Sequence, residues 1–401
     1  MARVSIATAR PSVRALTPGR LATLALAVGL VLLIAHGISW STRDGRGLLD
    51  WGSFWASGDA ANHGKDPYGV YPDTFRVGPG AMPAPNLNPP ISVYPLQLAA
   101  KFDVHHGETA WIAASLAGAL VAIVLLYRAY PRSGVVGILW ALAFAGLWHT
   151  VELGQIYVPL LLAATGAWLL LRDRDDWRAG LLIGFVVAIK PQFVAWPILL
   201  LLARHPRSAS ASFATAAVLS AVPFVLEGPE IYRQWLDATP PILPANLFPG
   251  NSSILSVAGR LHAGRAGLVL SALVFAAVAG VVFRRRPDRM AVSAAGLILA
   301  FLLGPISWPG YSLLLLPVFF TAGWQATFPA ALLMVFPYSE VLKLQDAGQP
   351  AAFLAASIYF FAAVLLAATL LREPRLLGSA ARRPEPEPEA GPVRTPAAAL
   401  E

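Results

Sequence analysis

Apolar runs about as long as a bilayer is thick recur from one end of this chain to the other, and they decide its class of fold. The interior of a bilayer offers the backbone no hydrogen-bond partners, so only α-helices and closed β-barrels cross it. Barrel strands alternate apolar and polar residues, and these runs do not alternate. With 56% apolar and only 13% charged residues, the chain is expected to be an all-α, polytopic membrane protein.

Twelve apolar segments are predicted to form transmembrane helices. The fifth and sixth are each too short to cross a bilayer alone, and they meet at Lys190-Pro191. A helix broken at this depth is tolerated only where it is buried in protein or lines a cavity, so we expect a buried hairpin. The segments lie near residues 21–40, 109–127, 135–149, 155–171, 178–190, 191–203, 209–226, 266–283, 291–304, 310–322, 325–338 and 351–371.

Basic residues determine the expected orientation. Short arginine-rich loops separate the apolar segments at 128–132, 172–178, 204–207 and 284–289. All four lie in the cytoplasm if the hairpin forms, as the positive-inside rule requires. The net charge of +8 therefore reports orientation in a membrane. Nucleic acid is not an expected partner, because the basic segments lack stacking platforms arranged along a groove.

Three regions are expected along the chain. Residues 1–20 form a basic cytoplasmic N-terminus, residues 21–371 the transmembrane domain, and residues 372–401 a disordered cytoplasmic tail. A cleaved signal peptide is the alternative interpretation of the first apolar run. That run is long for a signal core and no clear cleavage site follows it, which favours an uncleaved first helix.

Two long loops are expected on the extracytoplasmic side, at residues 41–108 and 227–265. Loops of this length are usually functional or disordered, and their aromatic content argues against disorder. Trp51, Phe54 and Trp55 share one helical face, which predicts a short helix over 51–62 that lies on the membrane surface.

Asp50 opens this predicted short helix, in the run GLLDWGSFWASGDAANHGKDPY. An aspartate at a helix start commonly caps the helix by accepting backbone hydrogen bonds. The alternative is a general base that faces a cavity under the large loop. The residue pattern alone favours the cap, because such acids are common at helix starts.

Four stretches, in a fixed order along the chain, favour the general base over the helix cap for Asp50. They are DWGSFWASGDAANHGKDPY, NPPISVYPL, GQIYVPLLL followed by RAGLLIGFVVAIKPQ, and NSSILSV. Together they resemble glycosyltransferase family 87, whose members are polyprenyl-phosphate-mannose-dependent mannosyltransferases with the GT-C membrane fold. The resemblance covers most of residues 21–371. It implies that Asp50 is the catalytic base and that the transfer inverts the anomeric centre.

The chemistry of such a reaction requires few residues. A polyprenyl phosphate is already a good leaving group, so a base and cations that hold the phosphate suffice. Lys190, within apolar sequence, and Arg260 are candidate phosphate ligands, with a snorkelling lysine and a solvated arginine as the alternatives. Candidate substrate-binding residues are Tyr68, Gln155, Asn251 and Tyr311.

One departure from the resemblance concerns a late outer loop. Many relatives carry a histidine shortly after the tryptophan of a serine-tryptophan motif. Here the sequence is GPISWPGY, so Gly310 and Tyr311 follow Trp308 and Pro309. Tyr311 is expected to bind the acceptor or the phosphate through its hydroxyl, or the contact is lost.

The resulting hypothesis is a membrane glycosyltransferase of the bacterial cell envelope. It transfers mannose or a related sugar from a polyprenyl-phosphate donor to a lipid or glycan acceptor at the outer face of the cell membrane. No cofactor is expected. No metal is expected either, because the chain has no cysteine and its outer acids show no ligand pattern. The alternatives are a transporter or flippase of a lipid-linked substrate, and a catalytically silent relative that binds the lipid carrier.

Overall fold

The computed structural model describes residues 18–42, 49–71, 85–239 and 248–378, and those residues form helices and loops without a strand. The all-α prediction is confirmed. Residues 1–17 of the predicted N-terminus and residues 379–401 of the predicted tail lie outside the described residues. The α-helices are α1 (Pro18–Ser41), α2 (Leu49–Asn62), α3 (Val93–Ala99), α4 (Val104–Ala129), α5 (Gly134–Leu142), α6 (Ala145–Leu153), α7 (Tyr157–Arg172), α8 (Asp176–Ile189), α9 (Ala195–Leu202), α10 (Pro206–Glu227), α11 (Glu230–Ala238), α13 (Ile254–Arg260), α14 (Gly264–Arg285), α15 (Arg289–Leu303), α16 (Leu316–Ala322), α17 (Phe328–Met334), α18 (Tyr338–Lys343), α19 (Ala351–Ala356), α20 (Ile358–Arg372) and α21 (Arg375–Gly378).

Helices occupy all twelve predicted segments, but they differ in length. Five are long and apolar enough to cross a membrane: Gly19–Ser41, Val104–Ala129, Pro131–Leu153, Pro206–Glu227 and Gly264–Arg285. Five shorter apolar helices have 10–17 residues: Tyr157–Arg172, Pro191–Leu202, Arg289–Leu303, Pro309–Ala322 and Ile358–Arg372. Two of them, Pro191–Leu202 and Pro309–Ala322, begin with a 3-10 turn led by a proline. The structure thus has several candidate spans, and the number of twelve stays a prediction.

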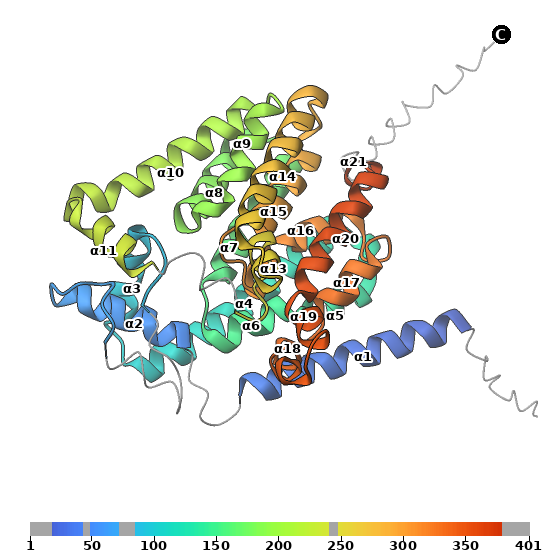
Figure 1. Cartoon of the computed structure of the whole chain (residues 1–401), viewed down its shortest axis with the longest axis horizontal. Coiled ribbons are helices and arrows are strands. Elements are labelled where there is room, and N and C mark those ends of the chain that lie inside the picture. The colour runs from blue at the N-terminus through green and yellow to red at the C-terminus, as the bar shows by residue number, and fades with distance from the viewer. Residues whose placement is uncertain (1–17, 43–48, 72–84, 240–247, 379–401) are drawn as a thin grey trace, which may run out of the picture.

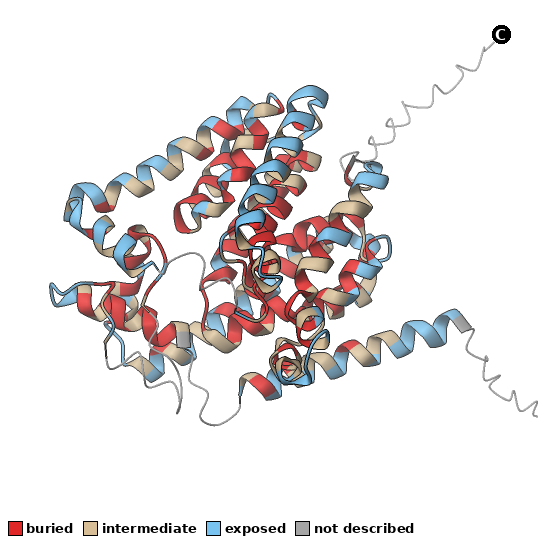
Figure 2. Ribbon diagram, viewed as in Figure 1, coloured by how far each residue is buried: buried red, intermediate tan, exposed pale blue. Residues whose placement is uncertain are grey.

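The core lies where α7, α8, α9, α15 and α16 meet (Figure 1). Trp168, Trp196, Phe301 and Phe319 are fully buried there. Figure 2 shows that α1, α10 and α14 are exposed along much of their length. Their exposed side chains include Val31, which is 50% exposed, and other leucines and valines, as expected for helix faces that contact lipid.

The predicted hairpin at Lys190-Pro191 is present. Helix α8 ends at Ile189, Lys190 leaves helical geometry with φ −136° and ψ 87°, and Pro191 begins a 3-10 turn (Pro191–Val194). The start of α8 and the end of α9 lie on the same side of the molecule, because both meet the loop before α15. Asp176 pairs with Arg289, and the His205 ring lies 3.2 Å from the Pro287 carbonyl oxygen.

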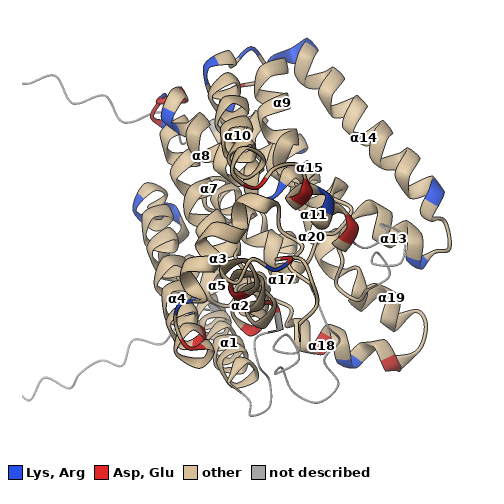
Figure 3. Ribbon diagram, turned by 90° about the vertical axis from the view of Figure 1, so that its left-hand side faces the viewer, with Lys and Arg blue, Asp and Glu red and all other residues tan. Residues whose placement is uncertain are grey.

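The basic loops gather on that side. Blue ribbon in Figure 3 marks lysine and arginine at the upper ends of α9, α10 and α14. Two further basic loops contact each other: the guanidinium of Arg172, at the end of α7, lies 5.7 Å from the centre of the ring of Tyr130, which follows α4. Helices α2, α3 and α11 lie away from these loops (Figure 1).

Two glycines of α8, four residues apart, allow α10 to approach closely. A Cβ atom on Gly180 would lie 2.5 Å from the Ala211 Cβ atom, and one on Gly184 would lie 2.4 Å from the Ser212 carbonyl oxygen. Small residues spaced in this way let two helices pack backbone to backbone, which is how apolar helices associate in a membrane. The α8–α10 pair thereby fixes where α8 ends and where Lys190 lies.

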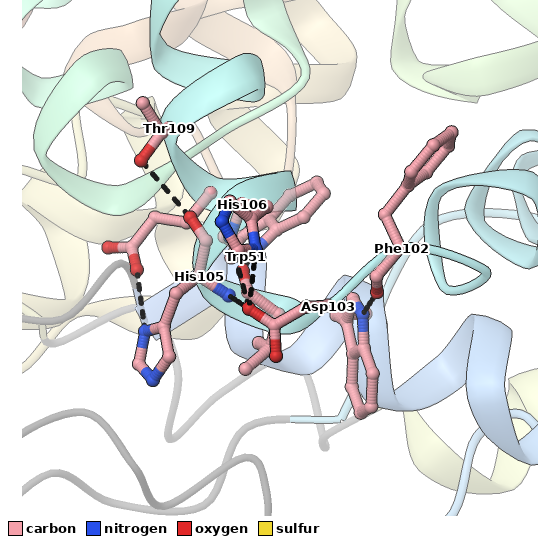
Figure 4. Close-up of polar contacts among 9 residues, drawn as sticks. Trp51, Phe102, Asp103, His105, His106 and Thr109 are labelled. Atoms are coloured by element: carbon pink, nitrogen blue, oxygen red, sulfur yellow. Dashed lines mark hydrogen bonds and ion pairs between the residues drawn. The ribbon is translucent and has the colours of Figure 1, made fainter.

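The predicted short helix over 51–62 is observed as α2, but its aromatic face is used for packing. Trp51 and Phe54 are 3% exposed. Trp51 donates a hydrogen bond to the Val104 carbonyl (3.2 Å) and Trp55 one to the Phe102 carbonyl (3.0 Å), both at the start of α4. In Figure 4 these contacts surround Asp103, which caps α4 by accepting from the backbone amides of His105 and His106. The aromatic face therefore fastens α2 to protein.

We predict that Gly184→Leu destabilises the fold, because a side chain there collides with the backbone of α10. Overpacking of this kind costs about 1–3 kcal/mol or more. Thermal unfolding of the detergent-solubilised protein should show a lowered midpoint. Gly280→Leu in α14 is the matched control, since nothing lies within 4 Å of a Cβ atom at that position. Equal midpoints for the two variants would contradict the close α8–α10 approach.

Candidate active site

A cavity of about 400 Å³ lies at the end of α8 that is remote from the arginine-rich loops. It is bounded by α2, the segment before α3, the end of α11, the α6–α7 loop, the α8–α9 break, and the loop that follows α15. Four of the predicted site residues line it: Asp50, Gln155, Lys190 and Tyr311. They come from parts of the chain that are far apart in sequence, so the fold alone brings them together.

Asp50 lies in the first turn of α2, inside the helix rather than in the position before it. Its Oδ2 atom accepts a hydrogen bond from Gln155 Nε2 at 2.5 Å. The carboxylate therefore has a side-chain partner in the cavity, which a helix cap alone does not explain. The interaction joins α2 to the loop between α6 and α7.

Trp111 of α4 holds both partners of this hydrogen bond in place. Its ring packs against Trp51 with ring centres 5.3 Å apart, and Trp51 directly follows Asp50. Its indole N–H donates to the carbonyl oxygen of Gly154 at 2.9 Å, and Gly154 directly precedes Gln155. Gly154 ends α6 with a positive φ of 69°, a conformation that favours glycine.

Burial changes the acidity of Asp50. Removal of the carboxylate from water raises its pKa to about 6, while the Gln155 hydrogen bond and the charge of Lys190 act in the opposite direction. A carboxylate with a pKa near 6 is a better proton acceptor than an ordinary aspartate and is still ionised at neutral pH. Asp50 can therefore act as a base, because its carboxylate is ionised at neutral pH and binds a proton more tightly than an ordinary aspartate does.

Lys190 occupies the break between α8 and α9, where Pro191 follows it. Its Nζ atom lies 5.3 Å from the centre of the Tyr157 ring and 5.2 Å from the centre of the Tyr311 ring. Such cation–π contacts stabilise an ammonium group by about 0.5–2 kcal/mol, depending on how far it is removed from water. The cavity thus contains one carboxylate and one ammonium group.

In the loop that lacks the expected histidine, Gly310 has no room for a side chain. A Cβ atom on Gly310 would lie 2.4 Å from Cδ2 of Tyr157 and 2.9 Å from Oγ1 of Thr150. Glycine therefore permits the Tyr157 ring to pack against this loop. The next residue, Tyr311, lines the cavity.

Three predicted site residues are not among the described residues that line the cavity. Tyr68 is buried between α2 and α11, where its hydroxyl donates to the Asn88 carbonyl at 3.1 Å. Asn251 is fully buried, and its Oδ1 atom accepts from the backbone amide of Ser307 at 3.0 Å. Ser307 lies between Ile306 and Trp308, two residues of the cavity wall. Asn251 thus supports that wall from behind.

Arg260 belongs to the same support. Its guanidinium donates to the Asn251 carbonyl (3.0 Å), the Ser256 hydroxyl (2.8 Å) and the Ser357 hydroxyl (3.1 Å). Burial lowers the pKa of Arg260 to about 10, so it stays charged at neutral pH. These contacts join α13, the start of α20 and the loop behind the cavity wall.

Several wall residues were not among the predicted site residues. Tyr157 is two residues after Gln155 in GQIYVP, a proximity that could have singled it out. Trp235 and Trp308 add aromatic surface, and Asn88 and Gln192 add amides. Their sequence surroundings are apolar or proline-rich, and only the fold turns them toward one cavity. Among the described residues, no three His, Asp or Glu side chains come close enough to hold a metal ion.

The sequence model of glycosyltransferase family 87 matches residues 86–305, more than half of the chain. The chain belongs to glycosyltransferase family 87. The resemblance drawn from four short stretches is thereby confirmed, and membership of family 87 makes this protein a glycosyltransferase. The matched residues contain Gln155 and Lys190, while Asp50 precedes them and Tyr311 follows them. Comparison with curated proteins and with solved structures gives no significant match.

We predict that Asn251→Leu lowers the thermal unfolding midpoint. The substitution keeps the branching of the side chain but leaves the buried amides of Ser307 and Ser253 without their acceptor. An unpaired buried donor costs about 1–3 kcal/mol. Asn62→Leu is the control, because the hydrogen bond that Asn62 donates to the Gln97 carbonyl (2.9 Å) is exposed at the end of α2. An unchanged midpoint for Asn251→Leu would remove Asn251 from the support of the cavity wall.

Proposed function

We propose that this protein transfers mannose or a related sugar from a polyprenyl-phosphate donor to a lipid-linked or cell-envelope acceptor, with inversion at the anomeric carbon. The observation that carries the proposal is the cavity in which Asp50 and Lys190 face a common space. A transfer of this kind needs a base for the acceptor and a cation for the leaving phosphate. Membership of family 87 supports the reaction class.

In the proposed reaction, Asp50 takes the proton of the acceptor hydroxyl. The acceptor oxygen forms a bond to the anomeric carbon on the face opposite the phosphate, and the bond between that carbon and the phosphate oxygen breaks. The phosphate leaves with the electron pair, and its added negative charge is stabilised by the ammonium group of Lys190. No proton has to be supplied to the leaving group, so one carboxylate is enough.

Gln155 has two roles in this proposal. Its Nε2 atom orients the Asp50 carboxylate, and its Oε1 atom is buried without a hydrogen-bond partner among the described residues. A buried acceptor of this kind fits a hydroxyl group of the sugar or the acceptor. Tyr311 bounds the same space. Tyr68, Asn251 and Arg260 are proposed to maintain the cavity walls and not to contact substrate.

The proposed setting is the cell membrane, with the active face outside the cytoplasm and a GT-C arrangement of the helices. The arginine-rich loops gather on the side opposite the cavity, which supports this orientation through the positive-inside rule. A polyprenyl-phosphate donor remains in the membrane, so a cavity beside apolar helices suits it. The acceptor hydroxyl approaches from the aqueous side, past α2 and α11.

Asp50→Asn is predicted to abolish sugar transfer, because an amide cannot accept the acceptor's proton. The loss should be about 100-fold or more. The assay uses membranes, labelled polyprenyl-phosphate mannose, and extraction of the product lipids. Asp59→Asn is the matched control, since Asp59 lies in the same helix and its partner is His63, 3.4 Å away. Retention of wild-type activity by Asp50→Asn would exclude Asp50 as the base.

The Asp50→Asn protein should still fold. Because the pKa of Asp50 is raised to about 6 from 3.8, the folded state binds this proton more tightly than the unfolded chain does. Its stabilising contribution is therefore complete below pH 3.8 and is lost as the pH rises through about 6. At neutral pH a neutral asparagine removes the cost of a buried charge, and the thermal midpoint should not fall.

The rate of transfer is predicted to depend on pH through Asp50. Only the ionised carboxylate accepts a proton, so kcat/KM should fall on the acid side with a midpoint near pH 6. Gln155→Leu removes a hydrogen bond that favours the ionised form, which raises the pKa of Asp50 further and moves the midpoint to higher pH. An acid limb that is unchanged in Gln155→Leu would contradict the assignment of that limb to Asp50.

A further inference from the structure

The ammonium group of Lys190 is held by two aromatic rings and not by an acid. The rings belong to Tyr157, at the start of α7, and Tyr311, in the 3-10 turn Pro309–Leu315, and both ring centres lie just over 5 Å from Nζ. Asp50 lines the same cavity, yet the described structure contains no ion pair between Asp50 and Lys190. Carboxylate and ammonium are therefore kept apart within one space.

The two rings are themselves fixed. Tyr157 is fully buried, and its ring packs against the backbone of Gly310, where a side chain has no room. Tyr311 is 5% exposed, and its ring contacts Tyr157 at 4.5 Å between centres and stacks on Phe193 at 6.2 Å with an angle of 26°. Neither ring can rotate away without repacking the core, so both present defined faces to Lys190.

Aromatic faces and carboxylates hold an ammonium group in different ways. The negative face of a ring attracts the charge without neutralising it and leaves the N–H groups available. A carboxylate partner would cancel the charge and occupy those donors. A lysine side chain is otherwise flexible, with a point charge at the end of a four-carbon stem. A pair of rings therefore gives a fixed location to a cation that still carries its full charge.

We propose that Tyr157 and Tyr311 are positioning residues that form an aromatic clamp on Lys190, with the charge kept free for the phosphate of the sugar donor. The proposal rests on the proposed function, in which Lys190 binds that phosphate. The clamp also prevents Lys190 from moving onto Asp50, so the base stays available to the acceptor. It requires the ring faces and not the hydroxyl groups.

The hydroxyl groups offer a competing explanation. The Tyr157 hydroxyl is buried and has no hydrogen-bond partner among the described residues. It could donate to the substrate directly, in which case the ring face would be incidental. Substitution by phenylalanine removes the hydroxyl and keeps the face, whereas substitution by leucine removes both. Comparison of the two substitutions at each position therefore separates the explanations.

The test measures binding of a short-chain polyprenyl phosphate and of the matching polyprenol, which lacks the phosphate, to the intact protein in detergent. Wild type should prefer the phosphate, and Lys190→Met should lose the preference. Tyr157→Phe and Tyr311→Phe should stay within about twofold of wild type. Tyr157→Leu and Tyr311→Leu should lose roughly tenfold in phosphate affinity while polyprenol binding is unchanged.

The outcomes distinguish the clamp from the function on which it rests. If wild type shows no preference for the phosphate, the phosphate role of Lys190 is wrong. If wild type shows the preference and both leucine variants keep it, the clamp is wrong while the proposed function stands. If phenylalanine variants lose as much as leucine variants, the hydroxyl groups act and the clamp is again overturned.

Loss of packing is controlled separately. Phe319→Leu removes a fully buried ring from the core without touching the cavity. It should lower the thermal midpoint yet leave the phosphate preference intact. In the transfer assay, the leucine variants at 157 and 311 should raise KM for the sugar donor with KM for the acceptor unchanged. A general folding defect would not produce this separation.

Discussion

The hydrogen bond between Gln155 and Asp50 is the interaction on which the site depends. It joins two segments that lie 105 residues apart in sequence and orients a carboxylate that burial makes more basic. Its geometry is set by Trp111, which contacts the residue after Asp50 and the residue before Gln155. A carboxylate oriented in this way lines the cavity and meets whatever enters it.

The bilayer imposes the second constraint. A break in a helix within an apolar environment is tolerated only where it is buried in protein or lines a cavity, because unpaired backbone groups are costly there. The break at Lys190-Pro191 places a cation at a cavity, and the close α8–α10 packing through Gly180 and Gly184 holds the broken helix in position. The packing of α8 against α10 therefore helps to determine where the charge of Lys190 lies.

The sequence predicted the class of fold well because apolar periodicity and arginine placement report directly on membrane helices. The short helix α2 and the break at Lys190 were also predictable, since aromatic spacing and proline act locally. The lengths of the individual helices were less predictable, because helix length in the folded chain depends on packing that local sequence does not encode. Local sequence also did not show that Trp51 and Phe54 pack against protein and not against the membrane surface.

The site was predictable in part. Asp50, Gln155, Lys190 and Tyr311 were singled out by sequence and share one cavity, although their chemical roles stay predictions. Arg260 and Asn251 looked like ligands because charged and amide groups near a predicted cavity usually are candidates. Their hydrogen bonds to backbone and hydroxyl groups reveal a supporting position that sequence cannot distinguish. Tyr157 was missed because an aromatic residue in an apolar run carries no chemical signal of its own.

The most direct measurement is an experimental structure of the protein with a non-transferable polyprenyl-phosphate sugar analogue bound. The account predicts the phosphate within hydrogen-bond distance of Lys190 Nζ and the anomeric carbon on the side of Asp50. An analogue bound with its phosphate on Arg260, or on the side of the arginine-rich loops, would contradict it.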